Sequence, residues 1–228
     1  CGEKLGLKAG KRYARANDAA EFAAVYAKMQ AYDDKPVVQA YIAGEGVGVC
    51  AVLDKDGNPA AVLCHRRVRE YPISGGPSTC CESFYDAHLV DEALRLLRAL
   101  HFVGVAMVEF KGNPEDGYKL LEINPRVWGS FPMTLAAGSR FAEVWARAAA
   151  GERFAAPDTD YVRGRRMFFL LNDAAACLSL LKKGRIGAAL GGLRDLLSPR
   201  VREALRRRGD PKPFRVYLKN ALKRGRNA

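Results

Sequence analysis

The sequence predicts an α+β fold: an antiparallel sheet with helices on one side, followed by a basic helical extension. Three observations lead to this prediction. Segments rich in β-forming residues come in pairs joined by short turns, which is typical of antiparallel hairpins. Between the pairs lie segments whose apolar residues recur at helical spacing. Finally, residues 161–228 contain 18 Lys and Arg but only 4 Asp and Glu, so the excess positive charge gathers at the C-terminal end.

The N-terminal part predicts a glycine loop, a helix and a strand. Asn17 and Asp18 offer an N-cap for a helix that runs to about residue 31, before Asp33 to Pro36 end it. Residues 37–42 (VVQAYI) then predict a strand. Residues 47–72 predict a β-hairpin, because its centre, Asp56-Gly57-Asn58, supplies residues that tolerate a positive φ.

The middle of the chain predicts a loop, a helix and a second hairpin. Residues 74–84 are polar and glycine-rich and predict a loop, whereas residues 86–101 carry leucines at helical spacing. Residues 103–110 and 118–126 predict a strand pair across a turn-rich connection, and residues 141–150 predict a helix.

The extension predicts only helices, at residues 165–184, 187–197, 199–209 and 214–225. The segment FAAPDTD near residue 155 predicts a linker. We therefore expect three parts, at residues 1–36, at residues 37–155 and, for the extension, at residues 156–228.

Composition narrows the class of protein. The chain has 228 residues, of which 49% are hydrophobic, which is enough for one sizeable core. No apolar run approaches the roughly 20 residues of a membrane-spanning helix, and the first residues lack a signal core, so we expect a cytoplasmic protein. Since the chain opens with Cys1 and no Met, inside a glycine-rich stretch, we expect it to be a piece of a longer protein.

The six cysteines predict no metal site. They form no CxxC pair and have no histidine partners at the spacing of a zinc site. The adjacent thiols of Cys80 and Cys81 are expected to be small, semi-buried groups in a reducing compartment and not a redox pair.

Two carboxylates and an amide on the second hairpin form the most informative pattern. Side chains alternate along a strand, so Glu122 and Asn124 share a face, and Glu109 on the neighbouring strand can face the same way. Converging carboxylates need a compensating cation, and magnesium prefers such oxygen ligands. Arg126 follows on the same face, where it can meet a phosphate. The plain alternative is a pair of exposed edge-strand charges balanced by neighbouring lysines.

A family resemblance extends this interpretation. The segments VVQAYIAGEGVGVCAVLD, HRRVREYPISGGPS, GVAMVEF and LLEINPRVWGS, in this order and spacing, resemble the C-terminal half of the ATP-grasp superfamily. Among its members, the carboxylate-amine ligases related to the carbamoyl-phosphate synthase large chain are the most similar. The resemblance covers about residues 1–155, with a looser likeness in the tail.

The resemblance implies site roles for particular residues. It implies that Glu109, Glu122 and Asn124 bind Mg2+, or Mn2+ in its place, beside the phosphates of ATP, and that Arg126 steadies the transferring phosphate. It also implies that a hinge binds adenine and that a nearby glutamate binds the ribose. The hinge residues are Gln39, Ala40, Tyr41 and Ile42, and the glutamate is Glu45.

The basic strand HRRVREYPISGGPS lies over the triphosphate and the acyl-acceptor site in the family, which implies catalytic roles for Arg67 and Arg69 and, less directly, for His65. The plain alternative is a solvated basic strand. The glycines at positions 2, 6 and 10 resemble a loop that closes over the phosphates. The family's ATP-binding lysine, which precedes that loop, is absent from this sequence, so we expect this chain alone to bind nucleotide weakly and not to turn over.

The resemblance implies an ATP-dependent ligase that activates a carboxylate as an acyl phosphate for attack by an amine. The expected partners are a small-molecule acid and amine, and a homodimer stays open. The alternative is a protein that binds nucleic acid or a membrane surface through the basic tail, on a non-catalytic body. Arginine runs favour nucleic acid, but no aromatic platform accompanies them. Amphipathic basic segments would fit anionic lipid. A third interpretation, favoured here, is a helical cap on the catalytic body.

Overall fold

The computed structural model describes residues 13–31, 33–207 and 209–226. The chain divides into two compact units, Cys1–Tyr41 and Ile42–Ala228. The glycine loop expected at residues 2–10 lies outside the described residues. Within that part of the chain, no helix is both long and apolar enough to cross a membrane.

The first unit contains the predicted helix, α1 (Ala19–Gln30). Asp18 caps it, since its carboxylate accepts a hydrogen bond from the Glu21 backbone N–H at 2.8 Å, and the Glu21 carboxylate accepts from the Asn17 N–H at 2.8 Å. The prediction of a strand at residues 37–42 is wrong, because that segment has no regular secondary structure. None of the strands described pairs with it, and strand propensity without a pairing partner does not make a strand.

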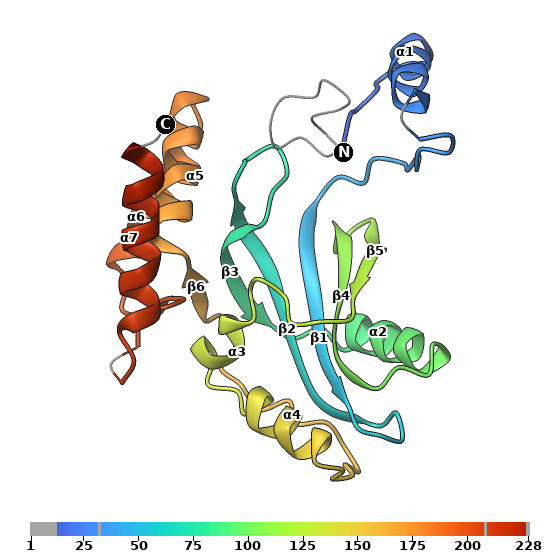
Figure 1. Cartoon of the computed structure of the whole chain (residues 1–228), viewed down its shortest axis with the longest axis vertical. Helices are drawn as coiled ribbons and strands as arrows, with labels where there is room; N and C mark the ends of the chain where they lie inside the picture. Colours follow the sequence, from blue (N-terminus) through green and yellow to red (C-terminus); the bar gives the residue numbers. More distant parts are fainter. Residues whose placement is uncertain (1–12, 32, 208, 227–228) are drawn as a thin grey trace. The chain divides into compact units, whose positions relative to one another are not determined.

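The second unit is built on one seven-stranded sheet (Figure 1). Its strands are β1 (Glu45–Leu53), β2 (Pro59–Glu70), β3 (Ser78–Phe84), β4 (Gly104–Asn113), β5 (Gly117–Asn124), β6 (Arg166–Phe168) and β7 (Val201–Glu203). The spatial order is β5-β4-β1-β2-β3-β6-β7. All neighbours pair antiparallel except β6 and β7, which are parallel. The α+β class is confirmed.

Six helices accompany this sheet in the described part of the unit: α2 (Ala87–Ala99), α3 (Pro132–Ala136), α4 (Phe141–Ala149), α5 (Leu170–Lys182), α6 (Ile186–Leu197) and α7 (Lys212–Arg226). The prediction that helices pack on one side of the sheet is wrong. In Figure 1, α2 lies on one side and α3 and α4 lie on the other. Each face has its own apolar cluster, because alternate residues of β1 and β2 point to opposite faces.

The first hairpin closes at a turn whose geometry the sequence predicts. Gly57 has a φ of +79°, a conformation that glycine adopts without strain. The buried carboxylate of Asp54 accepts hydrogen bonds from the backbone N–H groups of Asp56 and Asn58, both at 2.9 Å. It also accepts one from Phe154 at 3.1 Å, which ties the end of the hairpin to the segment after α4.

Strand β3 occupies part of the region for which the sequence predicts a loop. Cys80 and Cys81 are both fully buried, on opposite faces of the sheet, and β3 pairs with β2 on one edge and with β6 on the other. Burial raises the pKa of Cys81 to about 12 and raises that of Cys80 as well, so both thiols are protonated at neutral pH. Both are free cysteines, and the expectation that they are only semi-buried is wrong, because β3 lies between two other strands of the sheet and is covered on both faces at these positions.

The extension is attached to the sheet and is not purely helical. The helix predicted at residues 199–209 is wrong: residues 201–203 form β7, and the Ala204 N–H donates to the Phe168 carbonyl at 2.8 Å. The segment expected to be a linker is also held, since Asp158 exchanges backbone hydrogen bonds with Ala60 and Val62 of β2 at 2.8 and 2.9 Å. The functional division at residue 155 remains a prediction.

Candidate functional site

One row of residues crosses four strands of the sheet. Gly48 of β1 is paired with His65 of β2 on one side and with Glu109 of β4 on the other. Glu109 is in turn paired with Glu122 of β5. Paired residues in a sheet point to the same face, so a histidine and two carboxylates line one face around a position that has no side chain. The row forms the floor of the candidate site.

Two glycines of β1 make room for the side chains of this row. A Cβ atom at Gly48 would lie 2.7 Å from His65 Cε1 and 3.0 Å from Met107 Sδ. A Cβ atom at Gly46 would lie 3.0 Å from the Cδ of Arg67. All three separations are below ordinary contact distance, so the side chains of β2 and β4 reach over β1 because these two positions are glycine.

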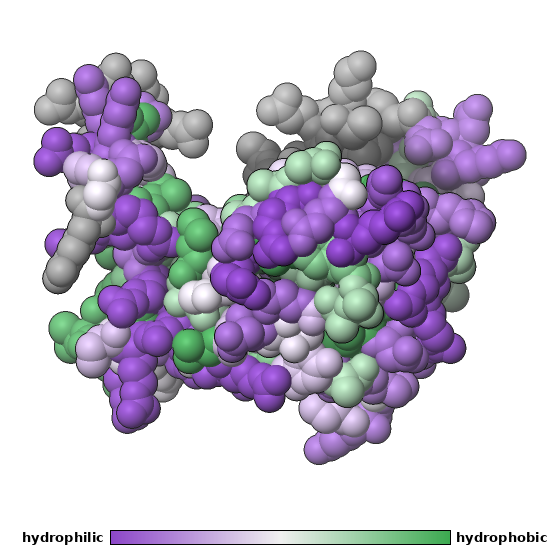
Figure 2. Space-filling view, turned by 90° about the horizontal axis from the view of Figure 1, so that it is seen from below, coloured by the Kyte–Doolittle hydropathy of each residue, from purple (hydrophilic) through white to green (hydrophobic). Residues whose placement is uncertain are grey.

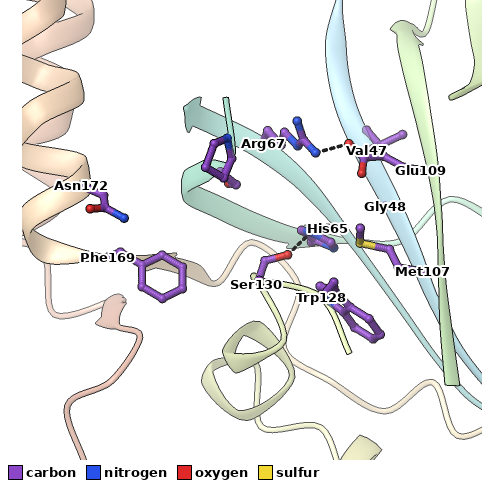
Figure 3. A pocket seen from close by; sticks show the side chains of 13 residues that line it. Val47, Gly48, His65, Arg67, Met107, Glu109, Trp128, Ser130, Phe169 and Asn172 are labelled. Carbon is purple, nitrogen blue, oxygen red and sulfur yellow. Dashed lines mark hydrogen bonds and ion pairs between the residues drawn. The ribbon is translucent and has the colours of Figure 1, made fainter. Parts of the chain in front are cut away.

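The Arg67 guanidinium pairs with the carboxylate of Glu109 across the face of β1, as Figure 3 shows. Glu109 is 3% exposed. Despite this ion pair, the pKa of Glu109 is raised above its usual range, because burial disfavours the charged form and the neighbouring charge of Glu122 adds to the effect. The site therefore holds a partly compensated excess of negative charge.

Glu122 and Asn124 complete the set of oxygens at the exposed edge. The Asn124 side-chain amide donates to Glu122 Oε1 at 2.7 Å, and Glu122 itself is exposed. Asn124 is paired with Met107, two residues from Glu109, and so lies on the same face. The geometry that the sequence predicts for these three side chains is confirmed, whereas their metal-binding role stays a prediction.

The donor set suits a cation that brings its own further ligands. Among the residues described, no group of three or more His, Cys, Asp or Glu side chains gathers to hold a metal. Two carboxylates and one amide are nevertheless hard oxygen ligands, and Mg2+ commonly combines one or two carboxylates with substrate phosphates and water. The residues present thus fit Mg2+ bound together with a nucleotide, and they do not form a complete protein cage.

The two predicted catalytic arginines of β2 lie in different surroundings. A register irregularity between Arg67 and Arg69 changes the simple alternation of side chains. Arg69 is directed to the extension, where it pairs with Asp173 of α5 at 2.9 Å and with Asp195 of α6 at 2.7 Å. Its side chain is only 8% exposed, so its donors hold helices and are not offered to a phosphate.

Arg126 also differs from its prediction. Strand β5 ends at Asn124, so Arg126 lies in the following loop and not on the same strand face. Its guanidinium is exposed and donates to the Val127 carbonyl at 3.1 Å. The physical reason is the proline at position 125, which lacks the N–H that would continue the β4–β5 ladder. A role in steadying phosphate remains a prediction for this residue.

The residues predicted to bind the adenosine part lie where β1 begins. Gln39, Ala40 and Tyr41 are exposed and Ile42 is partly buried, in a segment without regular secondary structure. The Glu45 carboxylate accepts a hydrogen bond from the Tyr118 hydroxyl at 2.8 Å. Burial and this bond raise the pKa of Tyr118 to about 12. These residues stay candidates for adenine and ribose binding.

Two adjoining pockets open on this face. The first, of about 240 Å3, extends from Arg67 and Glu109 past His65 to Trp128 and Phe169 (Figure 3). The second, of about 290 Å3, is more polar and includes Glu45 and Lys111. Arg67 lines both pockets. The wall residues that the sequence analysis did not single out include Met107, Lys111, Trp128, Ser130, Phe169, Asn172 and Arg185.

His65 is buried and forms part of the wall of the first pocket. Its Nε2 lies 2.8 Å from Ser130 Oγ, and its Nδ1 lies 3.6 Å from Cys50 Sγ. Burial and the nearby Arg67 charge lower its pKa to about 4. The imidazole is therefore neutral at physiological pH and contributes shape and hydrogen bonding to the pocket, without a positive charge.

The sheet, the facing carboxylates on its second hairpin and the arginine beside them agree with an ATP-grasp domain, the class that the sequence resemblance implies. The model of the family described as "ATP-grasp in the biosynthetic pathway with Ter operon" matches residues 33–167. This match covers more than half of the chain, and the chain belongs to that family. The resemblance to the ATP-grasp superfamily inferred from the sequence is confirmed.

One solved structure shows the same fold at low sequence identity. The biotin carboxylase domain of a thermophilic 2-oxoglutarate carboxylase, bound to bicarbonate, gives a TM-score of 0.51 at 13% identity over 65% of this chain and 36% of that chain. The biotin carboxylase of Campylobacter jejuni, in a complex with β,γ-ATP, gives a TM-score of 0.49 at 14% identity over 64% of this chain and 34% of that chain.

A curated relative is similar over a shorter stretch. Acetyl-CoA carboxylase 1 of Oryza sativa subsp. japonica is 36% identical over 88 residues, which are 36% of this chain and 4% of that protein. The chain thus spans about a third of the biotin carboxylases described above and a small fraction of the acetyl-CoA carboxylase.

Proposed function

We propose that this chain is the part of an ATP-dependent ligase that binds Mg-ATP and the acid substrate, and that the enzyme activates a carboxylate as an acyl phosphate for attack by an amine. Membership of an ATP-grasp family supports this proposal. The observation that carries it is the pairing of Glu109 with Glu122 on neighbouring strands, with the guanidinium of Arg67 against the buried carboxylate. An acidic pair beside a cation suits the binding of metal-bound phosphates.

In the first half-reaction, an oxygen of the substrate carboxylate attacks the γ-phosphorus of ATP. A new O–P bond forms, the bond from the γ-phosphorus to the bridging oxygen breaks, and ADP leaves. In the second, the amine nitrogen attacks the acyl carbon, the C–O bond to phosphate breaks, and the nitrogen loses a proton as the amide forms. Neither step requires a covalent intermediate on Ser or Cys, in keeping with the raised pKa values of the buried thiols.

Each residue of the site has a role in this scheme. Arg67 is placed to neutralise negative charge where the acid and the γ-phosphate meet, because it borders both pockets. Glu109, Glu122 and Asn124 would hold Mg2+, which supplies charge neutralisation to the transferring phosphoryl group when bound. Mn2+ has the same preference for oxygen ligands and would be accepted in its place.

The second pocket is the side on which we place the nucleotide. Glu45 and Lys111 line it together with Arg67 and, from the extension, Arg185. Its described lining contains four cations, with Arg69 as the fourth, against the two carboxylates of Glu45 and Glu70. This excess of positive charge favours an anionic ligand such as a polyphosphate, and the carboxylate of Glu45 can accept from a ribose hydroxyl. The hinge Gln39, Ala40, Tyr41 and Ile42 remains the proposed adenine contact.

The replacement Glu122→Gln tests this proposal in the complete enzyme. With ATP, Mg2+, a panel of acids and hydroxylamine as the acceptor, the wild-type protein should form hydroxamate. The variant should lose at least about a hundredfold of this activity, since a metal-site carboxylate is removed. Because Glu122 is exposed, the free energy of unfolding of the variant should differ from that of the wild type by no more than about 0.5 kcal/mol.

The matched control is Glu115→Gln, in the exposed turn between the same two strands. It removes the same charge from the same hairpin without touching the site, and near wild-type activity is expected. Near wild-type activity of the Glu122→Gln enzyme, or absence of hydroxamate with every acid, would overturn the proposed function.

A further inference from the structure

Among the lining residues that the structure describes, the first pocket has one lysine or arginine side chain, which lies at its border with the second pocket. Arg67 occupies this position. One nitrogen of its guanidinium pairs with Glu109, and another makes two long contacts, at 3.5 Å with the Gly76 carbonyl and at 3.8 Å with the Glu70 carboxylate. Since a guanidinium carries five N–H donors, Arg67 can still receive a carboxylate from the pocket side. A ligand's acidic group is thus expected at this end.

Away from Arg67 the walls of the pocket are mainly apolar and uncharged. Met107 and Trp128 form one side, and the Phe169 ring projects from the opposite side (Figure 3). Two of the polar groups on the wall, His65 and Ser130, are hydrogen-bonded to each other at 2.8 Å. Because the pKa of His65 is low, its imidazole is neutral and adds no positive charge to this wall. A second carboxylate would lose its hydration here and meet no cation.

The size of the pocket limits the body of the ligand. Its volume of about 240 Å3 lies below the roughly 300–1,000 Å3 that is usual for drug-sized ligands. A single ring or a short branched chain fits such a space.

The C-terminal extension supplies one wall. Phe169 and Asn172 come from the start of α5, and the Phe169 N–H donates to the Thr79 carbonyl of β3 at 2.9 Å, which fixes the backbone beside the pocket. The ion pairs of Arg69 with Asp173 and Asp195 hold the same helix region in place. The extension therefore contributes directly to ligand selection.

We infer that the acid substrate is a compact monocarboxylic acid with an apolar body, held with its carboxylate at Arg67 and its body between Trp128 and Phe169. This inference rests on the proposed ligase function, which leaves the acid unspecified. It makes Phe169, in the extension, a specificity-determining residue.

Binding to the 228-residue chain tests the inference without turnover. The chain has two tryptophans, so the replacement Trp145→Phe leaves the fluorescence of Trp128 as a reporter in the pocket wall. Benzoate and isovalerate should bind saturably by fluorescence and by calorimetry. Succinate, with a second carboxylate, and benzamide, without a carboxylate, should each bind at least about tenfold more weakly.

Variants in the same background separate the two ends of the pocket. Phe169→Ala should weaken benzoate binding about tenfold by removing apolar contact, and Arg67→Gln should weaken it by about tenfold or more while leaving benzamide unaffected. Leu178→Ala is the matched control, because Leu178 is an exposed residue of the same helix α5 outside the pocket, and it should bind benzoate like the parent chain.

Tighter binding of succinate than of benzoate, no binding of benzoate by either method, or an unchanged affinity in Phe169→Ala would overturn the inference. Those outcomes leave the ligase proposal intact, since it is decided by acyl-phosphate trapping in the complete enzyme. Conversely, failure to trap an acyl phosphate would overturn the ligase and not the binding preference.

Discussion

Glu109 shows how a single residue balances opposing electrostatic effects. Its burial raises its pKa, the Arg67 guanidinium acts in the opposite direction, and Glu122 on the adjacent strand raises it further. A carboxyl held in this way has more to gain from a divalent cation than an exposed one, because a nearby cation favours its charged form. Glu109 is thus suited to a metal-bound phosphate, whereas without a bound cation its ionised form is destabilised by burial and by Glu122.

His65 should make the stability of the protein depend on pH. Its pKa is lowered to about 4 in the folded protein from an ordinary value of 6.5, so between these values the unfolded chain binds more protons. The contribution of neutral His65 to the free energy of unfolding is therefore fully present above pH 6.5, and it is lost as the pH is lowered toward 4. From pH 6.5 to 5 the loss should be about 2 kcal/mol, measured by urea unfolding.

His65→Gln should remove this component of the slope, and His88→Gln, at an exposed position of α2, serves as the matched control. The carboxylates that also respond to acid are unchanged in both variants. Identical pH dependence in wild type and His65→Gln would contradict the assignment of a neutral buried imidazole.

The sequence predicted the residues of the second hairpin better than those of the pocket walls. Alternation along one strand placed Glu122 with Asn124, and a short turn brought Glu109 opposite them, so local rules were sufficient. Phe169 and Asn172 could not be found in this way, because they reach the pocket only through the pairing of β6 with β3, which are distant in sequence. Their signal was an apolar run, MFFLL, which also fits an ordinary helix.

At the scale of elements, strand β1 works as a floor because it lacks side chains at the right positions. Gly48→Ala places a Cβ atom 2.7 Å from His65 and 3.0 Å from the Met107 sulfur. We expect it to destabilise the protein by about 1–3 kcal/mol, as overpacked sites do, and to weaken benzoate binding. Chemical denaturation and fluorescence titration measure the two effects.

Gly129→Ala provides the comparison for that variant, since Gly129 also lines the first pocket but a Cβ atom there meets nothing within 4 Å. It should leave the folding free energy within about 0.5 kcal/mol of wild type. Equal stability of the two variants would show that β1 tolerates a side chain at position 48.

The attachment of the extension depends on a buried ion network around Arg69. This arginine pairs with Asp173 and Asp195, and Arg166 of β6 also pairs with Asp195, at 2.8 Å. Arg69→Met leaves two buried carboxylates with fewer partners, so we expect a loss of about 3–5 kcal/mol in unfolding free energy. Denaturant titration measures it.

Arg95→Met is the control for Arg69→Met, because Arg95 also pairs with two carboxylates, those of Asp91 and Glu92, but on the exposed surface of α2. Such a pair contributes little, and a change below about 1 kcal/mol is expected. A similar small change in Arg69→Met would mean that the network does not hold the extension.

Hairpins were predictable and distant pairings were not. The turn at Gly57 and the Asp86 N-cap of α2 depend on residues that are close together in the sequence. Strand β3 was missed because turn-forming residues precede it and its polar Ser and Glu residues hide the alternation, while one of its two partners, β6, lies far along the chain. Strand β7 was likewise interpreted as helix, since only its parallel pairing with β6 makes it a strand.

At the scale of the whole molecule, α6 carries an exposed apolar stripe beside basic residues. Ile186, Leu190, Leu193 and Leu197 recur at helical spacing and are all exposed. Figure 2 shows apolar side chains reaching the surface among hydrophilic ones on the C-terminal helices. The cations of α5, α6 and the turn between them are Lys182, Lys183, Arg185 and Arg194.

This combination matches an anionic lipid surface better than DNA, which needs no apolar contact. We expect the chain to sediment with phosphatidylserine vesicles at about 50 mM salt and to be released at about 500 mM. The double variant Leu190→Ser, Leu193→Ser should lose vesicle binding while retaining its charge. Retention of binding in that variant, or binding to duplex DNA alone, would contradict the prediction.

The net charge of +12 arises in the extension, as the composition indicates, but the arrangement of that charge was not predictable. Some of its arginines are turned inward: Arg166 pairs with Glu82 and Asp195. Only the three-dimensional packing separates the cations that hold the extension to the sheet from those that face solvent.

The position of Arg67 on the boundary of two cavities has a thermodynamic consequence. If one guanidinium serves both ligands, occupation of either cavity changes the donors left for the other, so the affinities for acid and nucleotide must be linked. Linkage of this kind is reciprocal. The factor by which bound acid changes the affinity for nucleotide equals the factor by which bound nucleotide changes the affinity for acid. Affinities for one ligand measured without the other would then describe a different equilibrium from the one that operates during turnover.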